Sequence, residues 1–267
     1  MANFFFFYMW KVVAMHGSYS GPAMCSHKTK TKKKKSFFFA THTTMSQQPH
    51  LRLGSTAPDF KADTTNGPIL FHEYIGDSWA ILFSHPAAHT SVCSTELSAF
   101  ARLEPEFTKR GVKLLAISAD PVEANSDWID DMEDFSGSRV KFPIIADPER
   151  KVATLYDMID HQDATNLDDK GLQLTIRAVF IIDPSKKIRL IMTYPASTGR
   201  NTAEVLRVLD SLQLVDKQKV ITPINWVPGD DVLVHMGVPD DEARVLFPKY
   251  RAIKPYIRLT PLEKEDK

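Results

Sequence analysis

Four short, largely apolar runs of residues mark the folded part of the chain. They span residues 79–83, 112–117, 142–146 and 178–182. Largely apolar runs of this length predict strands that are buried on both faces of a sheet. Apolar residues at helical spacing lie between and after these runs, near residues 97–107, 128–132, 152–156 and 202–214. Strand and helix patterns therefore alternate, which predicts an α/β layered fold.

The two ends of the chain differ from this patterned part. The patterned part begins near Leu53 and closes with the helical segment 202–214, which ends the main domain. After Val220 proline becomes frequent, which predicts a small, loop-rich appendage rather than a second enzyme core. The predicted organisation is an extension at residues 1–45, a main domain at 53–214 and a small carboxy-terminal domain at 220–267.

The charge of the chain is unevenly distributed. Its 267 residues include 33 Lys+Arg and 33 Asp+Glu, but eight of the basic residues and no acidic one precede Asp59. The rest of the chain therefore carries a net charge of −8 and has no basic stripe, so nucleic acid is not an expected partner. The apolar stretch at residues 4–15 is interrupted by Lys11 and is shorter than the ~20 residues that span a bilayer, so stable membrane insertion is not expected.

The extension, residues 1–45, leaves the location in the cell open. It is basic and free of acidic residues, as mitochondrial presequences are, although it carries Lys where such peptides favour Arg. A secretory signal fits poorly, because the charge lies within and after the apolar stretch. A solvated, disordered tail is the other interpretation of the basic run at residues 32–35. We therefore expect a cytoplasmic protein, or a mitochondrial one if the extension is a presequence.

Candidate chemistry is concentrated at one cysteine. The chain has only Cys25 and Cys93, which excludes a disulfide scaffold and a thiolate zinc site. The strand pattern 79–83 runs into a loop, and a helical pattern begins at Cys93, where unpaired backbone N–H groups would stabilise a thiolate. Pro86 and Thr90 complete a Pro-x-x-x-Thr-x-x-Cys spacing, in which a rigid proline can shield the sulfur and a hydroxyl can bind a substrate oxygen. This surrounding favours a nucleophile over a buried structural cysteine.

Further motifs resemble those of the peroxiredoxins, and within them the one-cysteine, peroxiredoxin-6-like group. The resemblance runs from about Leu53 to Leu259 and implies a thioredoxin-like α/β fold with a small carboxy-terminal dimerisation domain. It also implies a homodimer that reduces hydrogen peroxide and organic hydroperoxides in antioxidant defence. The motifs are Gly76-Asp77-Ser78-Trp79, Phe83-Ser84-His85-Pro86, Thr90 to Leu97 (TSVCSTEL), Phe142-Pro143-Ile144-Ile145, Arg177-Ala178-Val179-Phe180, Tyr194 to Asn201 (YPASTGRN) and Thr222 to Trp226 (TPINW).

The resemblance assigns roles to residues at matching positions. Cys93 is similar to the peroxidatic cysteine of the family, and Arg177 to the arginine beside its sulfur. Thr90 and Pro86 match the pocket around the cysteine. The residues that match the supports of this pocket are His85, Glu96 and Arg200. Thr90, the amides of the helix terminus and Arg177 are donor types that would stabilise the oxyanion leaving from a peroxide.

Two positions depart from the family pattern. His89 replaces an aromatic residue and Ser91 replaces a proline. Neither change removes a donor, so the departures bear on rate and pocket shape rather than on the reaction type. His89 either adds a titratable group near the sulfur or faces solvent.

The reductant is expected to be external. Attack on a peroxide converts a cysteine to a sulfenic acid, which a thiol must then resolve. The only other cysteine, Cys25, lies in the extension and is not expected to act. We therefore expect glutathione, thioredoxin or another thiol as reductant, and no bound cofactor. Metal binding has no support, because the nine histidines are scattered and no His-x-x-x-His or Cys-x-x-Cys pair is present.

Two other functions compete with peroxide reduction. Some members of the resembled group show a calcium-independent phospholipase A2 activity ascribed to a Ser/His/Asp set, and His72 and Ser78 match two of its positions. The third position is Ser185, and Asp183 lies two residues away, so the orienting carboxylate is missing. The second alternative is a non-catalytic thioredoxin-like chaperone that has kept the site by descent, which an unreactive Cys93 would favour.

Overall fold

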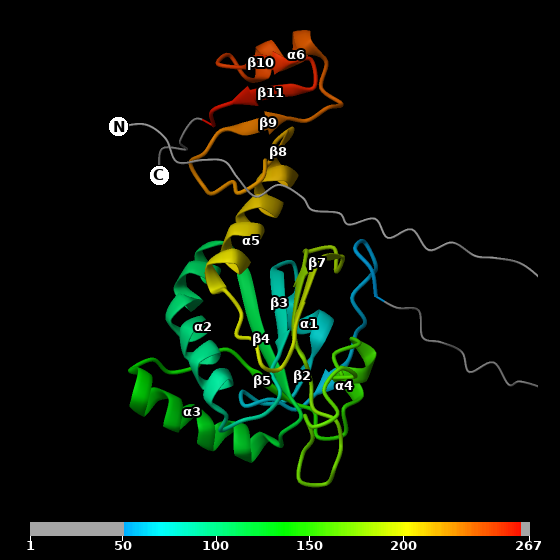
Figure 1. Cartoon of the computed structure of the whole chain (residues 1–267), viewed down its shortest axis with the longest axis vertical. Helices are drawn as coiled ribbons and strands as arrows, with labels where there is room; N and C mark the ends of the chain where they lie inside the picture. Colours follow the sequence, from blue (N-terminus) through cyan, green and yellow to red (C-terminus); the bar gives the residue numbers. More distant parts are fainter. Residues whose placement is uncertain (1–50, 263–267) are drawn as a thin grey trace, which may run out of the picture. The chain divides into compact units, whose positions relative to one another are not determined.

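The computed structural model describes residues 51–262, and its centre is a five-stranded sheet with the order β5-β4-β3-β6-β7 (Figure 1). Largely apolar runs form four of these strands, and β3, β4 and β6 are buried along almost their whole length. The strands are β3 (Trp79–Ser84), β4 (Val112–Ser118), β5 (Ile144–Ala146), β6 (Arg177–Ile182) and β7 (Ile188–Tyr194).

The sheet is mixed, and this determines which residues meet at its edge. Strands β3, β4 and β5 are parallel, whereas β6 is antiparallel to β3 and β7 is antiparallel to β6. Phe83 pairs with Val179, so the first residue of β6, Arg177, lies beside the carboxyl end of β3. A parallel β6 would have started at the opposite edge of the sheet, away from the loop that follows β3.

Helices cover both faces of this sheet (Figure 1). One buried cluster joins the sheet to α2, α3 and α5, and the other joins it to α1 and α4. Strand residues such as Ile81 and Leu82 alternate between the two clusters, as the period of a strand requires. The helices are α1 (Phe71–Ile75), α2 (Ser91–Lys109), α3 (Val122–Ser136), α4 (Lys151–Leu155) and α5 (Thr202–Lys217).

Helix α2 positions the cysteine. Its buried stripe includes Leu97, Phe100 and Phe107, and the ring of Phe100 stacks on that of Phe83 in β3 with centroids 4.4 Å apart. These contacts fix the helix on the sheet. The helix ends at Lys109, and Gly111 then adopts a φ of 66°, a left-handed conformation that favours glycine.

A short hairpin precedes the sheet. Strands β1 (Lys61–Ala62) and β2 (Ile69–Leu70) pair antiparallel around the predicted turn, where Gly67 has a φ of 96°. Thr64 forms an isolated bridge to Ile145, so this hairpin covers the outer edge of β5.

Most predicted elements of the main domain are confirmed, and some of their limits change. The apolar runs at 79–83, 112–117 and 178–182 are strands, while the run at 142–146 forms a strand only from Ile144. The prediction that the helix begins at Cys93 was wrong by two residues, because Ser91 already has helical conformation. Strand β7 was not predicted, because it lies outside the continuous apolar runs.

The carboxy-terminal residues are more regular than predicted. Instead of a loop-rich appendage they form a four-stranded antiparallel sheet, ordered β10-β11-β9-β8, and one short helix. Two small buried clusters hold it together, one around Trp226 and one around Val238. The elements are β8 (Val220–Ile221), β9 (Val232–Val234), α6 (Asp240–Leu246), β10 (Arg251–Lys254) and β11 (Ile257–Thr260). The division at residues 214 to 220 falls at the end of α5 and remains a prediction.

Candidate active site

Cys93 is the third residue of helix α2 and has no exposed surface. The first hydrogen bond of the helix runs from the Ser94 amide to the Thr90 carbonyl at 2.9 Å. The amides ahead of Ser94 therefore lie in the turn where a helix leaves its N–H groups without intrahelical partners. The partial positive charge of such a turn favours an anionic sulfur.

Arg177 lies beside the sulfur, as its position at the start of β6 allows. Its Nη1 donates to Cys93 Sγ at 3.3 Å and to Glu96 Oε2 at 2.8 Å. Its Nε donates to the Ala196 carbonyl at 2.7 Å, which fixes the plane of the guanidinium. Arg177 is buried, so this contact is made away from bulk water.

Arg200 and Glu96 complete a buried cluster of charges. Glu96 accepts from Arg200 Nε at 3.0 Å, from Arg200 Nη2 at 2.8 Å and from the Arg200 amide at 2.7 Å. Arg200 Nη1 donates to the carbonyls of Ser84 and Ala178, which ties the cluster to β3 and β6. Burial lowers the pKa of Arg200, and Glu96 opposes this shift. Two arginines and one glutamate leave the cluster with one positive charge, which a thiolate would neutralise.

Thr90 and Pro86 lie in the loop between β3 and α2. Thr90 is the N-cap residue of α2, but its side chain does not cap the helix. Its hydroxyl donates to the Ala87 carbonyl at 3.0 Å, so it does not point its hydrogen at the sulfur. Pro86 is buried. The loop thus brings both residues next to the start of the helix, and their roles in the pocket remain predictions.

His85 is fully buried, and neither ring nitrogen has a hydrogen-bond partner among the described residues. Its ring centroid lies 5.3 Å from that of Trp128. Burial, reinforced by the positive charges of Arg200 and Arg177, holds the pKa of His85 well below 6.5. The imidazole is therefore neutral in the folded protein near neutral pH.

This depressed pKa predicts that the protein loses stability in acid. Below pH 6.5 the unfolded chain protonates His85 and the folded protein does not, so the free energy of unfolding falls as the pH falls. The slope from this residue approaches about 1.4 kcal/mol per pH unit. We expect the free energy of unfolding, measured by urea denaturation between pH 7.5 and 5.5, to depend less steeply on pH in His85→Phe than in wild type. An equal slope in His85→Phe would contradict the assignment, and the exposed His161→Gln serves as control.

The two departures from the family pattern lie at the surface of the site. His89 adopts a φ of 53°, and its half-exposed ring has Nδ1 3.2 Å from Asp131 Oδ2. Ser91 is exposed and occupies the first helical position, which tolerates proline and serine alike. Among residues 51–262, no hydrogen bond or ion pair joins His89 or Ser91 to the sulfur of Cys93.

Three residues of the site were missed by the sequence reasoning. Trp128 Nε1 donates to Ser94 Oγ at 3.0 Å, and Ser94 Oγ donates to the Thr90 carbonyl at 2.8 Å. Asp120 Oδ2 accepts the Ala88 amide at 2.8 Å. Only Asp120 carried a signal, because it follows a predicted parallel strand and so lies at the same sheet edge as the cysteine loop.

The residues proposed for lipid hydrolysis are not brought together. His72 has Nε2 2.8 Å from the Ala57 carbonyl and Nδ1 3.9 Å from Asp59. Asp183 accepts the Lys187 amide and pairs with Arg189 at 3.3 Å. No hydrogen bond among residues 51–262 joins any two of the candidate set, which therefore gains no support from the geometry. The candidates are His72, Ser78, Ser185 and Asp183.

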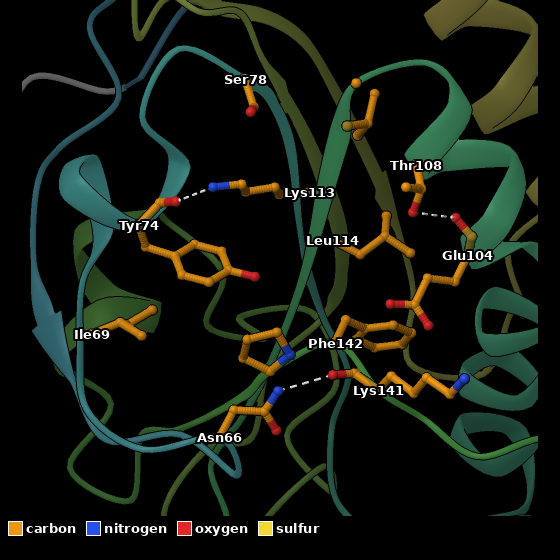
Figure 2. Close-up of a pocket in the computed structure, with 13 residues that line it drawn as sticks. Asn66, Ile69, Tyr74, Ser78, Glu104, Thr108, Lys113, Leu114, Lys141 and Phe142 are labelled. Atoms are coloured by element: carbon orange, nitrogen blue, oxygen red, sulfur yellow. Dashed lines mark hydrogen bonds between the residues drawn. The ribbon is translucent and has the colours of Figure 1, made fainter.

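Ser78 lies instead at a cavity of about 420 Å³ near the carboxyl end of α2 (Figure 2). Lys113 donates to the Tyr74 carbonyl there, and burial together with the nearby charge of Glu104 raises the pKa of Tyr74. Burial also raises the pKa of Glu104. Cys93 does not line this cavity, so it is separate from the cysteine site.

No group of three or more His, Cys, Asp or Glu residues within residues 51–262 could hold a metal ion. No helix of that part is both long and apolar enough to cross a bilayer.

Comparison with known families matches both parts of the chain. Residues 53–191 match the model of the AhpC/TSA family, and residues 211–246 match that of the C-terminal domain of 1-Cys peroxiredoxin. The mitochondrial peroxiredoxin PRX1 of Saccharomyces cerevisiae is 56% identical over 216 residues, which cover 80% of this chain and 82% of that protein. Peroxiredoxin-6 of Gallus gallus is 48% identical over 223 residues, with 80% and 98% covered.

Solved structures agree with this result. A cysteine-to-serine mutant of the peroxiredoxin 6 of Arenicola marina superposes with a TM-score of 0.76 at 46% identity, over 80% of this chain and 99% of that one. The yeast mitochondrial 1-Cys peroxiredoxin gives a TM-score of 0.73 at 55% identity, over 79% and 100%. The thioredoxin-like fold is thus confirmed, and the chain belongs to the one-cysteine peroxiredoxins, which are thiol-dependent peroxidases.

Proposed function

We propose that Cys93 attacks the hydroperoxide and that Arg177 holds the reacting atoms in place. The observation that carries this proposal is the 3.3 Å contact between Arg177 Nη1 and Cys93 Sγ inside a buried cluster of net positive charge. A neutral thiol would leave one positive charge in the protein interior without compensation. The cluster therefore favours the thiolate, which is the nucleophilic form.

The reaction balances with these residues alone. The thiolate of Cys93 attacks one peroxide oxygen, an S–O bond forms and the O–O bond breaks. The other oxygen leaves as hydroxide or alkoxide and takes up a proton, which yields water or an alcohol. The sulfur is oxidised to a sulfenic acid and the peroxide is reduced. Arg177 and the first-turn amides of α2 supply positive charge where the leaving oxygen develops its negative charge.

The other residues support this arrangement. Glu96 fixes the guanidinium of Arg177. Arg200 in turn fixes Glu96 and is itself held by hydrogen bonds to carbonyls of β3 and β6. The Thr90 hydroxyl, whose acceptor is now the Ala87 carbonyl, can rotate to bind a peroxide oxygen. Pro86 and His85 are buried residues of the loop that leads from β3 to α2. We assign Thr90 to substrate binding and Glu96, Arg200, Pro86 and His85 to support.

The reductant is an external thiol. Cys93 is the free, buried cysteine of the described residues, and Cys25 lies outside them. The solved yeast relative is described as resolved through glutathione/thioredoxin systems. We infer that a thiol of one of these two kinds reduces Cys93 here as well.

A homodimer is the expected assembly. Strand β7 is the last strand of the central sheet, so its outer edge is free to pair within the described part of the chain. The carboxy-terminal residues, of which 211–246 match the C-terminal domain of 1-Cys peroxiredoxin, also expose several large apolar side chains. These are Ile224, Met236, Val245 and Tyr256. Exposed apolar side chains of this kind favour burial against a second copy.

We propose a mitochondrial location for this protein. The Saccharomyces cerevisiae relative is a mitochondrial protein. Together with the basic, acid-free sequence of residues 1–45, which lie outside the described residues, this favours the mitochondrial over the cytoplasmic alternative.

One measurement tests the function. Stopped-flow oxidation of the reduced protein by hydrogen peroxide and by a lipid hydroperoxide should show rapid reaction of one thiol per chain, and intact mass should rise by one oxygen. Glutathione or thioredoxin added afterwards should restore the reduced mass. No reaction with either peroxide would reject the proposal and would favour the non-catalytic chaperone. Release of fatty acid from phospholipid would support the hydrolase alternative.

A further inference from the structure

The regular pairing between β3 and β6 stops just before the active site. Phe83 and Val179 are the last residues of the two strands that pair. Beyond them, Arg200 Nη1 donates to the Ser84 carbonyl at 2.8 Å and to the Ala178 carbonyl at 2.9 Å, so one carbonyl of each strand is bound by the same guanidinium. The remaining buried backbone groups at this end of β6 must find partners outside the ladder, because an unpaired buried amide or carbonyl is costly.

A buried hydroxyl supplies these partners. Ser84 Oγ donates to the Ile176 carbonyl at 2.6 Å and accepts the Ala178 amide at 3.0 Å. A serine hydroxyl has a single hydrogen to donate, so its one donor is used here together with one of its acceptor positions. Ser84 has no exposed surface. Ile176 and Ala178 are the two chain neighbours of Arg177, so the hydroxyl of Ser84 fixes the backbone on both sides of the arginine.

This hydroxyl acts on the backbone and not on the reacting groups. Strand alternation places Ser84 on the same face of the sheet as Leu82, in the cluster with α1 and α4. Arg177 shares the opposite face with Val179, in the cluster with α2. Both hydrogen bonds of Ser84 end on the main chain of β6 and its preceding residue, and neither reaches Cys93. Removing the hydroxyl therefore changes where Arg177 is held and leaves every group that takes part in the reaction in place.

A second buried hydroxyl holds the same segment. Thr175 has no exposed surface, and its Oγ1 donates to the His85 carbonyl at 2.7 Å. Ser84 and His85 are consecutive residues at the end of β3. Residues 84–85 thus bind residues 175–178 through two side-chain hydroxyls. The bond of Thr175 lies two residues away from Arg177, so its effect on the arginine is weaker than that of Ser84.

We propose that Ser84 is a positioning residue whose hydroxyl aims the Arg177 guanidinium at the sulfur of Cys93. This proposal rests on the peroxidase function proposed above. Glu96 and the Ala196 carbonyl hold the far end of the Arg177 side chain, whereas Ser84 holds the backbone from which it extends. Without the hydroxyl, a buried amide and a buried carbonyl lose their partner, and the backbone must shift to find others. A displacement of about 1 Å at a reacting group can slow a reaction about a hundredfold.

The test measures oxidation of the reduced, full-length protein by hydrogen peroxide in stopped flow, together with the pH profile of Cys93 alkylation. Ser84→Ala should slow oxidation roughly tenfold. Its alkylation profile should move to higher pH, but less than that of Arg177→Ala, because the guanidinium is still present. Thr64→Val is the matched control, since its buried hydroxyl likewise donates to one carbonyl (Gly67) and accepts one amide (Asn66), but in the hairpin that precedes the sheet. It should lower the urea midpoint and leave the oxidation rate within twofold of wild type.

A double variant shows whether Ser84 acts through Arg177. In the Arg177→Ala background, Ser84→Ala should change the oxidation rate by less than twofold, because the side chain that it positions is already gone. Thr175→Val should slow oxidation less than Ser84→Ala, and it provides the test if Ser84→Ala does not fold. Rates and alkylation profiles that match those of Thr64→Val would overturn the proposal, as would an equal slowing by Ser84→Ala with and without Arg177. Failure of wild type to react with peroxide would instead reject the peroxidase function itself.

Discussion

Replacing Cys93 by serine is expected to abolish peroxide turnover, whereas Cys25→Ser leaves it nearly unchanged. Cys93 combines the first turn of a helix with a buried guanidinium 3.3 Å from its sulfur, whereas Cys25 lies outside the described residues. A serine hydroxyl at this position is not ionised near neutral pH and is a poor nucleophile, so the same surroundings cannot rescue the reaction. Peroxide consumption in the presence of excess thiol measures the effect, and Cys25→Ser is the matched control.

Mass analysis shows which sulfur reacts. After one equivalent of peroxide, the added oxygen should reside on the peptide that contains Cys93. A stoichiometric disulfide between Cys25 and Cys93 would contradict the one-cysteine mechanism, because Cys25 would then act as the resolving thiol. Full turnover by Cys93→Ser would reject Cys93 as the nucleophile.

Arg177→Ala is expected to slow the oxidation of Cys93 by peroxide a hundredfold or more. Arg177 is the donor whose Nη1 reaches both Cys93 and Glu96, so its loss removes positive charge from the sulfur and from the leaving oxygen. Loss of one preorganised donor typically costs roughly 3 kcal/mol of transition-state stabilisation. Arg177→Lys keeps the positive charge but loses the planar guanidinium. We therefore expect this variant to preserve the thiolate form of Cys93 more fully than the rate of its oxidation by peroxide.

Two measurements separate these effects. Alkylation of Cys93 by iodoacetamide as a function of pH reports the thiolate, and stopped-flow kinetics with hydrogen peroxide report the rate. The alkylation profile of Arg177→Ala should move to higher pH, and that of Arg177→Lys should move less. In both variants Glu96 can keep its hydrogen bonds to Arg200, so this buried carboxylate is still paired. Arg177→Ala with wild-type oxidation and alkylation would place Arg177 outside the active site.

The local elements and the reactive residue followed from the sequence. Continuous apolar runs indicated β3, β4 and β6, because a strand buried on both faces needs no polar positions. The helical spacing from Leu97 to Phe107 indicated α2, and the strand-loop-helix order located Cys93 at a helix terminus. The motif around Cys93 and the resemblance it carried indicated the family. These signals are local, because each apolar pattern and each motif is a short segment of the chain.

The geometry of the site was decided by the tertiary structure. Arg177 reaches Cys93 across 84 residues of sequence only because β6 runs antiparallel to β3, and no local pattern encodes the direction of a strand. Arg200 meets Glu96 across 104 residues, because the turn after β7 returns the chain to the start of α2. The contacts of Trp128 with Ser94 and of Asp131 with His89 depend on how α3 packs. Such contacts are set by the global packing of apolar faces, and the sequence alone does not specify which polar side chains this packing brings together.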